Sequence, residues 1–195
     1  MQAFEGYRGF PDVMCIAVNE EVQHTIPGDR IINDGDTVNC DLGVLWKGLI
    51  TDAATTFPVG KISAEAQNLL DGVELALEAA LRTVRHGVKV REVSKAIEKV
   101  LKSHGLGIVR ELCGHGVGDE LHQDPDIPNF GADGGGFRLK AGMTIAIEPI
   151  GTAGSSAIKF MPDGWNITTV DGGWAAQFEH SVVVTHKGCE VLTKI

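Results

Sequence analysis

The chain has 195 residues, of which 43% are hydrophobic and 22% are charged, and its net charge is −9 at pH 7. This composition is typical of a folded globular protein and excludes a largely disordered chain. A domain of this size buries roughly 70% of the surface of its unfolded chain, so we expect one domain over residues 1–195. The acidic balance argues against nucleic acid as a direct partner, because phosphate binding needs a basic surface.

No apolar run approaches the ~18 residues that a membrane-spanning helix needs, and the N-terminal residues lack the basic start of a signal peptide. We therefore expect a cytoplasmic protein without a membrane partner. The chain has four cysteines, Cys15, Cys40, Cys113 and Cys189. They form no Cys-x-x-Cys pair and are too sparse for a disulfide framework, so we expect reduced, mostly buried thiols.

Three strands are predicted at the start of the chain. Apolar and β-branched residues predict a strand over 13–18 and another over 37–44. Lys47-Gly48 then turns the chain into a third strand, which ends near Phe57. The second and third strands are expected to form a hairpin.

Two amphipathic helices are predicted after the hairpin. Ser63 is a suitable cap for a helix over 64–85, whose apolar residues recur at spacings of three and four and which Gly87 ends. A second helix is expected over 90–104, with Gly105 as its stop.

The rest of the chain predicts strands and loops. A glycine-rich stretch over 131–136 is typical of a surface loop. Strand patterns recur over 108–113, 143–148, 166–169, 177–184 and 190–193. Strands, two helices and then further strands form an α+β pattern with a mostly antiparallel sheet.

Four acidic residues occupy strands that otherwise have the composition of a core: Asp41, Asp52, Glu148 and Glu179. A single such acid would be interpreted as a residue on an exposed face. Four together are harder to explain, because charged acids are almost never fully buried unless they are paired or bind a metal. Few Lys or Arg residues are near these strands. Two divalent cations would balance the four charges and could form a hydrolytic site.

A histidine between glycines is the second notable feature. His115 lies in Cys113-Gly114-His115-Gly116-Val117-Gly118, where the glycines allow a tight bend and leave the imidazole accessible. We interpret His115 as a nitrogen ligand, although a lone histidine in this setting is more often a turn residue.

These motifs together resemble the type I methionine aminopeptidases over residues 6–192. The motifs that carry the resemblance are His24-Thr25-Ile26-Pro27, Val38-Asn39-Cys40-Asp41, Thr51-Asp52, the stretch from Cys113 to Gly118, His122 with Pro125, Ile147-Glu148-Pro149 and Gln177-Phe178-Glu179-His180. Each motif is weak alone, and their order and spacing make the set specific.

The resemblance implies the pita-bread fold and removal of the N-terminal methionine from nascent polypeptides whose second residue is small. It implies two divalent ions, cobalt, manganese or iron with zinc as a further candidate, and a hydroxide between them that attacks the first peptide bond. Asp52 and Glu179 would bridge the ions. Asp41 would bind one ion, and His115 and Glu148 would complete the other.

The resemblance also implies roles for residues that contact the substrate. Glu148 would take a proton from the attacking water, His122 would stabilise the tetrahedral intermediate, and His24 would lie on the leaving-group side. His180 follows a ligand and is expected on the opposite face of its strand. The methionine side chain would enter an apolar pocket formed by Tyr7, Phe10, Cys15, Leu121 and Trp165.

Some features depart from the family pattern. Leu121 stands where we expect an aromatic residue, and the helical segment that precedes the first strand in the family is absent. Its absence would expose an apolar face of the first hairpin, so we expect an oligomer or a partner chain to cover it. The substrate would be a peptide or a nascent polypeptide, met at the ribosome.

Two alternatives remain open. Another pita-bread peptidase, one that cleaves Xaa-Pro bonds, would share the five ligands, but Cys113-Gly114-His115-Gly116 favours the methionine aminopeptidases. A non-catalytic binding module of the same fold is the other, and the presence of all five ligands argues against it.

Overall fold

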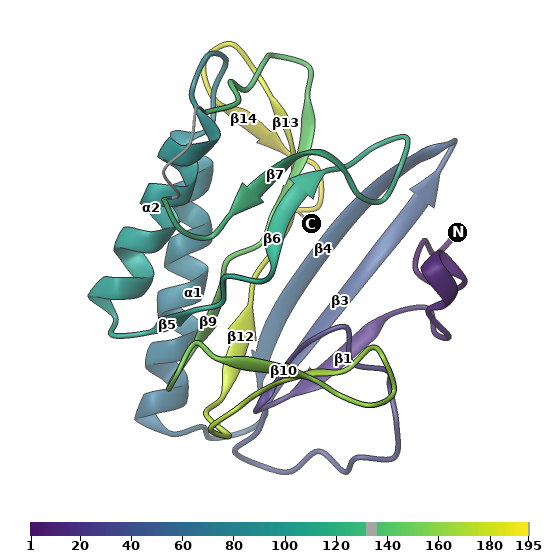
Figure 1. Cartoon of the computed structure of the whole chain (residues 1–195), viewed down its shortest axis with the longest axis vertical. Coiled ribbons are helices and arrows are strands. Elements are labelled where there is room, and N and C mark those ends of the chain that lie inside the picture. Colours follow the sequence, from purple (N-terminus) through teal and green to yellow (C-terminus); the bar gives the residue numbers. More distant parts are fainter. Residues whose placement is uncertain (132–135, 195) are drawn as a thin grey trace.

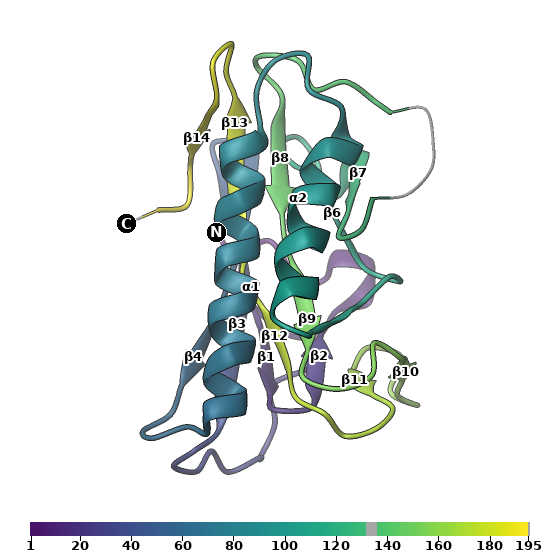
Figure 2. The same ribbon diagram turned by 90° about the vertical axis from the view of Figure 1, so that its left-hand side faces the viewer.

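The computed structural model describes residues 1–131 and 136–194, in which two helices pack side by side along one side of a group of antiparallel sheets (Figures 1 and 2). The glycine-rich stretch predicted as a loop over 131–136 falls mainly on residues 132–135, which lie outside the described residues. None of the helices in the described residues is both long and apolar enough to cross a membrane.

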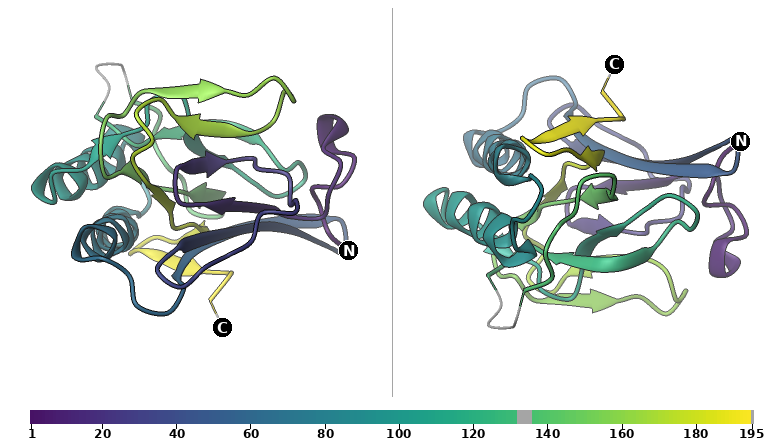
Figure 3. Two further views of the ribbon diagram at one scale, coloured as in Figure 1. Left: turned by 90° about the horizontal axis from the view of Figure 1, so that it is seen from below. Right: turned by 90° about the horizontal axis from the view of Figure 1, so that it is seen from above.

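The predicted hairpin forms the longest pair of strands. β3 (Thr37–Trp46) and β4 (Leu49–Pro58) pair antiparallel along their whole length, and β1 (Cys15–Val18) pairs with the other edge of β3. Lys47 and Gly48 both have positive φ, at 51° and 85°, which is the backbone conformation of a tight two-residue hairpin turn. Seen along the long axis of the molecule, the hairpin extends away from the helices (Figure 3).

The two helices form as predicted, with small differences at their ends. α1 (Ala64–Thr83) is capped by Ser63, whose Oγ accepts a hydrogen bond from the Ala66 N–H at 3.1 Å. It ends two residues earlier than predicted, because Val84 adopts an extended backbone and is buried instead. α2 (Val90–Ser103) stops before Gly105, which has a φ of 70°.

The apolar stripes of both helices pack onto the sheets and form the main core. Leu69 and Val73 of α1 and Ile97 and Leu101 of α2 are completely buried, as is Ile145 of the sheet beneath them. Burial of such side chains stabilises the fold by about 1.5–3 kcal/mol each. The helices therefore cover the side of the sheets that faces away from the hairpin.

The remaining elements are short. They comprise η1 (Tyr7–Gly9), β2 (Glu21–Gln23), β5 (Gly107–Ile108), β6 (Cys113–Gly116), β7 (Gln123–Pro128), β8 (Thr144–Ile147), β9 (Ile150–Thr152), β10 (Ile158–Phe160), β11 (Ile167–Thr169), β12 (Ala175–Gln177), β13 (His180–Val184) and β14 (Cys189–Val191). Every strand pair of the described residues is antiparallel.

Two predicted strands differ from the structure, and β2, β7, β9 and β10 were not predicted. The strand predicted over 108–113 is two strands, because β5 ends at Ile108 and β6 begins at Cys113. The strand predicted over 177–184 is interrupted between β12 and β13, where the Glu179 N–H donates a hydrogen bond to the Ala54 carbonyl of β4 at 2.8 Å. A pairing with β4 thus replaces the pairing that a continuous strand would make.

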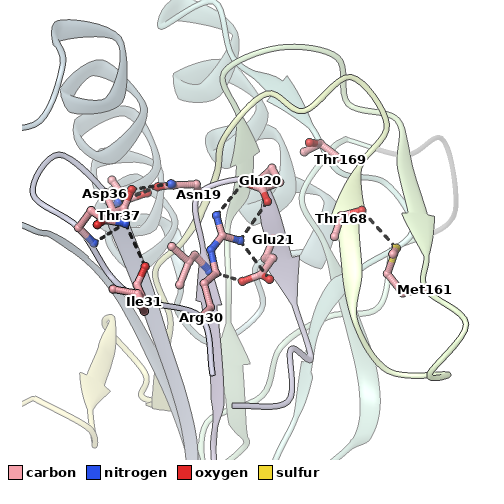
Figure 4. Close-up of polar contacts among 12 residues, drawn as sticks. Asn19, Glu20, Glu21, Arg30, Ile31, Asp36, Thr37, Met161, Thr168 and Thr169 are labelled. Carbon is pink, nitrogen blue, oxygen red and sulfur yellow. Dashed lines mark hydrogen bonds and ion pairs between the residues drawn. The ribbon is translucent and has the colours of Figure 1, made fainter. Parts of the chain in front are cut away.

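Polar contacts anchor the segment between β1 and β3 (Figure 4). Arg30 forms ion pairs with Glu20 at 3.0 Å and with Glu21 at 3.2 Å, and the Asn19 amide donates a hydrogen bond to Asp36 at 2.8 Å. These contacts connect the loop after residue 23 to the strand before it. They fix the backbone on either side of the histidine at position 24.

Candidate metal centre

One cavity brings together every residue that the sequence predicted for the site. It lies between the hairpin, β6, the ends of β8 and β12, and the N-terminal segment. Its walls carry the five predicted ligands, Asp41, Asp52, His115, Glu148 and Glu179; the histidines His24 and His122; and the predicted pocket residues Tyr7, Phe10, Cys15, Leu121 and Trp165. Phe4, Arg8 and Gln23 also line it and were not predicted.

The hairpin register places its two acids on one face. Asp41 lies opposite Ala54, and Asp52 lies opposite Gly43, so the two acids are diagonal neighbours two positions apart. Residues two apart on a strand point to the same side. The Ser181 hydroxyl of β13 holds the β4 backbone here, because it accepts from the Asp52 N–H and donates to the Asp52 carbonyl, both at 2.8 Å.

The four acids are deeply buried, with exposed fractions of 2% to 4%. Burial raises the pKa of Asp52 to about 7, and it raises the pKa values of Asp41, Glu148 and Glu179 well above their usual range, with further contributions from the neighbouring carboxylates. Among the described residues, no Lys or Arg forms an ion pair with them. In this part of the chain, therefore, no cationic side chain balances the four acids by direct contact.

His115 presents a free nitrogen to these acids. Its Nδ1 lies 2.9 Å from the carbonyl oxygen of Gly116, which can only accept, so Nδ1 carries the proton and Nε2 has a free lone pair. Nε2 lies 3.6 Å from Glu148 Oε1 and 3.8 Å from Asp52 Oδ2. Burial lowers the pKa of His115, which keeps the ring neutral as a ligand must be.

The glycines around His115 have a different purpose from the one predicted. A Cβ at Gly114 would collide with the Ala146 carbonyl of β8, and one at Gly116 would collide with the Asp124 carbonyl of β7. Neither glycine has positive φ. Close approach of the neighbouring strands, rather than a tight bend, therefore requires glycine on both sides of the histidine.

The donor set fits divalent cations. Asp52, His115 and Glu179 each offer a ligand atom within 4.8 Å of the others. Asp41 Oδ1 and Glu179 Oε1 are buried and have no hydrogen-bond partner within residues 1–131 and 136–194. Cations would balance the charge and satisfy these oxygens, and carboxylate oxygen with one imidazole nitrogen suits Mn²⁺, Fe²⁺ or Co²⁺.

Comparison with known proteins decides the family. Residues 2–186 match the sequence model of metallopeptidase family M24. The chain belongs to metallopeptidase family M24. Within it the chain is similar to the methionine aminopeptidase 1 of Bacillus subtilis, with 42% identity over 193 residues, which are 99% of this chain and 78% of that protein.

Solved structures give the same result. The crystal structure of a methionine aminopeptidase from Thermotoga maritima matches 99% of this M24 chain and 78% of its own chain, with 41% identity and a TM-score of 0.96. A prolidase from Pyrococcus furiosus matches 93% of this chain and 49% of its own, with 26% identity and a TM-score of 0.76. The predicted pita-bread fold and the resemblance to methionine aminopeptidases are thereby confirmed.

The two further histidines of the M24 site lie beside the predicted ligands. The His122 ring is 4.2 Å from the His115 ring, and its Nδ1 is 2.9 Å from the Tyr7 hydroxyl. Burial, followed by the charges of His115, His24 and Arg8, lowers the pKa of His122 to about 3. Burial and then His115 lower the pKa of His24. Both imidazoles are therefore neutral near pH 7.

An apolar pocket adjoins the acids. Phe10, Cys15 and Leu121 are buried together with Phe4, and the rings of Phe10 and Trp165 meet edge to face at 5.1 Å. Phe4 was missed because it precedes the predicted strands, and nothing local in the sequence marks it. Its ring packs against Gly43 of β3, where a Cβ would come within 2.8 Å of it.

Two side-chain amides in the site were not predicted. Gln23 Nε2 donates to Glu148 Oε2 at 3.0 Å, and Gln177 Nε2 donates to the same oxygen at 3.2 Å and to Glu179 Oε2 at 3.2 Å. Gln177 lies in the motif quoted above, so its position was visible. The predicted orientation of His180 agrees with the structure, in which it lies outside the cavity and contacts the Thr193 hydroxyl at 2.8 Å.

Proposed function

We propose that this chain removes the N-terminal methionine from peptides and nascent polypeptides with a small second residue, with the help of two divalent ions. One observation carries the proposal: four buried carboxylates and a neutral imidazole line the same cavity as an apolar pocket. A hydrolytic centre and a binding site for an unbranched apolar side chain are thus adjacent. The similarity to methionine aminopeptidases supports the same substrate.

In this proposal Asp52 and Glu179 would hold both ions, Asp41 would hold one of them, and His115 and Glu148 would hold the other. The ions are Mn²⁺, Fe²⁺ or Co²⁺, with Zn²⁺ as a further candidate, because these cations accept mixed carboxylate and imidazole ligands. When bound, they supply Lewis acidity, which lowers the pKa of water and polarises the substrate carbonyl.

Glu148 is the residue that moves protons in this proposal. Its carboxylate would accept a proton from the attacking water and pass it to the amine of the leaving peptide. The Gln23 and Gln177 amides donate to Oε2, so Oε1, on the side of His115, is the oxygen that remains available.

His122 would stabilise the negative oxygen that develops on the substrate carbonyl. The Tyr7 hydroxyl can donate to His122 Nδ1, which leaves the proton on Nε2 for a hydrogen bond to the substrate. A neutral imidazole is suited to this donation, and the low pKa of His122 keeps it neutral. His24, which lines the same cavity, would contact the leaving-group side.

The pocket formed by Phe4, Phe10, Cys15 and Leu121, with Tyr7 and Trp165 at its edge, would bind the methionine side chain. An unbranched thioether adapts to a cleft of aromatic rings and sulfur, and burial of apolar area favours its binding. Burial raises the pKa of the Cys15 thiol, which stays neutral and apolar beside the acids.

We place the reaction in the cytoplasm, on chains that emerge from the ribosome, and we propose that residues 1–195 act as one catalytic domain. The cysteines support a reducing compartment, since all four are free. Cys15 is buried, whereas the other three are half-buried.

A peptide assay tests the proposal against the alternative, a peptidase that cleaves Xaa-Pro bonds. The similarity to a prolidase is the reason to test this alternative. The chain is stripped of metal, reloaded with Mn²⁺ or Co²⁺, and mixed with Met-Ala-Ser or Ala-Pro-Ser. We expect free methionine from the first peptide only, and none before reloading. Cleavage of the proline peptide alone would replace the proposal with the alternative, and cleavage of neither would contradict both.

A further inference from the structure

Gln23 is the last residue of β2, next to His24, and its side chain reaches the cavity. It is 6% exposed. The backbone at this position is fixed by its pairing with Ile167 of β11, and the Arg30 ion pairs hold the start of the same strand (Figure 4). The side chain therefore projects into the cavity from a rigid support.

The side-chain amide of Gln23 binds one carboxylate oxygen of Glu148, a predicted metal ligand. Its Nε2 donates to Glu148 Oε2 at 3.0 Å, and Gln177 donates to the same oxygen. The other oxygen, Oε1, lies on the side of His115, 3.6 Å from its Nε2. Two donors on one oxygen oppose rotation of the carboxylate, so Oε1 is kept as the oxygen that would bind an ion together with His115.

The carbonyl oxygen of the Gln23 side chain indicates that this residue does not serve the stability of the fold. Oε1 of Gln23 is buried and has no hydrogen-bond partner among the described residues. A buried carbonyl without a partner is unfavourable, and an apolar side chain of the same size would avoid the cost. A glutamine here needs a reason other than packing, and its contact with Glu148 supplies one.

We propose that Gln23 is a positioning residue, which orients Glu148 for metal binding and proton transfer. The inference rests on the proposed function. It differs from the role of Gln177, whose amide touches two ligands and whose backbone also contacts Thr56 of β4. Among the described residues, the Gln23 side chain forms its hydrogen bond to Glu148, and its amide also opposes the rise in the pKa of Asp41 that burial causes, so its substitution reports mainly on Glu148.

The test compares Q23L, Q23E and a matched control, T25V. Q23L removes the donor at similar size, and Q23E replaces the donor with an acceptor of the same shape. Thr25 lies two residues away, is 4% exposed, and has a hydroxyl without a hydrogen-bond partner among the described residues, so T25V alters the same segment without touching Glu148.

Metal affinity is measured by titration calorimetry with Mn²⁺ on the stripped proteins, and kinetics are measured at saturating Mn²⁺ with Met-Ala-Ser. For Q23L we expect Mn²⁺ to bind about 10- to 100-fold more weakly at the position assigned to His115 and Glu148. This is the range found when partners of metal ligands are removed. We expect kcat to fall about tenfold or more, with KM unchanged, because Gln23 is outside the apolar cluster. Q23E should lose more Mn²⁺ affinity and more kcat than Q23L, and T25V should match the wild type in both.

Several results would overturn the inference. Wild-type affinity and kcat in Q23L would do so while leaving the proposed function intact, as would equal losses in Q23L and T25V. A large drop in the melting temperature of metal-free Q23L and Q23E, with normal metal affinity of the folded protein, would make the role structural. A wild-type chain that binds no Mn²⁺ would contradict the proposed function and this inference together.

Discussion

The two faces of the β3–β4 hairpin reverse the usual distribution of polar and apolar residues. The inner face carries Asp41 and Asp52, which are 3% and 4% exposed, whereas the outer face carries Leu42, Val44 and Trp46, which are 41%, 41% and 68% exposed. Because side chains alternate along a strand, a register shifted by one residue would bury the apolar set and expose the acids. The protein therefore adopts the register in which acids are buried and apolar side chains are exposed, which the hydrophobic effect alone would disfavour.

Contacts from distant strands fix this register. The Ser181 hydroxyl of β13 binds both the backbone N–H and the backbone carbonyl of Asp52. The Thr56 hydroxyl accepts a hydrogen bond from the backbone N–H of Gln177 at 3.0 Å. The hairpin is thus held by the elements that carry the other predicted ligands. Buried acids mark the inner face as the candidate functional face, and the exposed outer face makes no contact with the cavity.

The largest effect is expected from E179Q. Glu179 is 2% exposed, and Asp52 and His115 offer ligand atoms near its own. A neutral amide removes one of the four acidic groups that would hold the proposed ions, so turnover should fall on the order of 1,000-fold or more and metal analysis should show loss of bound ion. Glu190→Gln on exposed β14 is the control and should behave as wild type. Normal turnover in E179Q would refute the ligand role.

A smaller effect is expected from H122A. The ring of His122 lies beside His115 and the Tyr7 hydroxyl, yet it belongs to the substrate side of the proposed site. Loss of one donor to a developing oxyanion costs about 100- to 1,000-fold in kcat, while calorimetry should show unchanged metal affinity. His104→Ala, at the end of α2, is the matched control. If H122A weakened metal binding as much as it weakened kcat, His122 would be a ligand instead.

The elements that the sequence predicts well are those specified locally. The Lys47-Gly48 turn sets the hairpin, and Ser63 and Gly105 set a start and a stop of the helices. The ligands could be named because a carboxylate in an apolar strand is conspicuous in a single sequence. The predicted hairpin brings Asp41 and Asp52 together, whereas the convergence of His115, Glu148 and Glu179 was implied only by the family resemblance, since each belongs to a different part of the chain.

What the sequence could not give depends on pairing between distant residues. β2 is three residues long and exists because Gln23 pairs with Ile167. The break before β13 exists because the Glu179 backbone bonds to Ala54. Neither interaction leaves a local pattern, so β2 was missed and β12 and β13 were merged. The amide of Gln23 escaped notice for the same reason.

The buried acids predict an unusual pH dependence for the metal-free chain. Asp52 has a pKa of about 7 when folded against 3.8 as its ordinary value. Between these values the folded state holds a proton that the unfolded state has lost, so the free energy of unfolding falls as the pH rises through this window. The other three acids act in the same direction, because burial raises each of their pKa values as well.

Urea denaturation of the stripped chain at pH 4, 5.5 and 7.5 measures this decline. D52N should make the decline shallower, and Asp119→Asn, at an exposed position, should leave it unchanged. Mn²⁺ should restore stability at pH 7.5, because ions bind the deprotonated acids of the folded state only. Stability that rises from pH 4 to pH 7.5 without metal would show that the acids are charged and balanced by the protein itself.

The smallest effect on catalysis is expected from the outer face of the hairpin. Trp46 and Leu49 are 68% and 59% exposed, and they point away from the cavity. The double variant W46T/L49T should change kcat/KM less than twofold and the free energy of unfolding by about 0.5 kcal/mol or less, as exposed substitutions usually do. Apolar surface promotes association, so light scattering at high concentration should give a lower mean mass for the variant than for the wild type. Equal masses would show that this face drives no association, and a large loss of activity would show that the two faces are not independent.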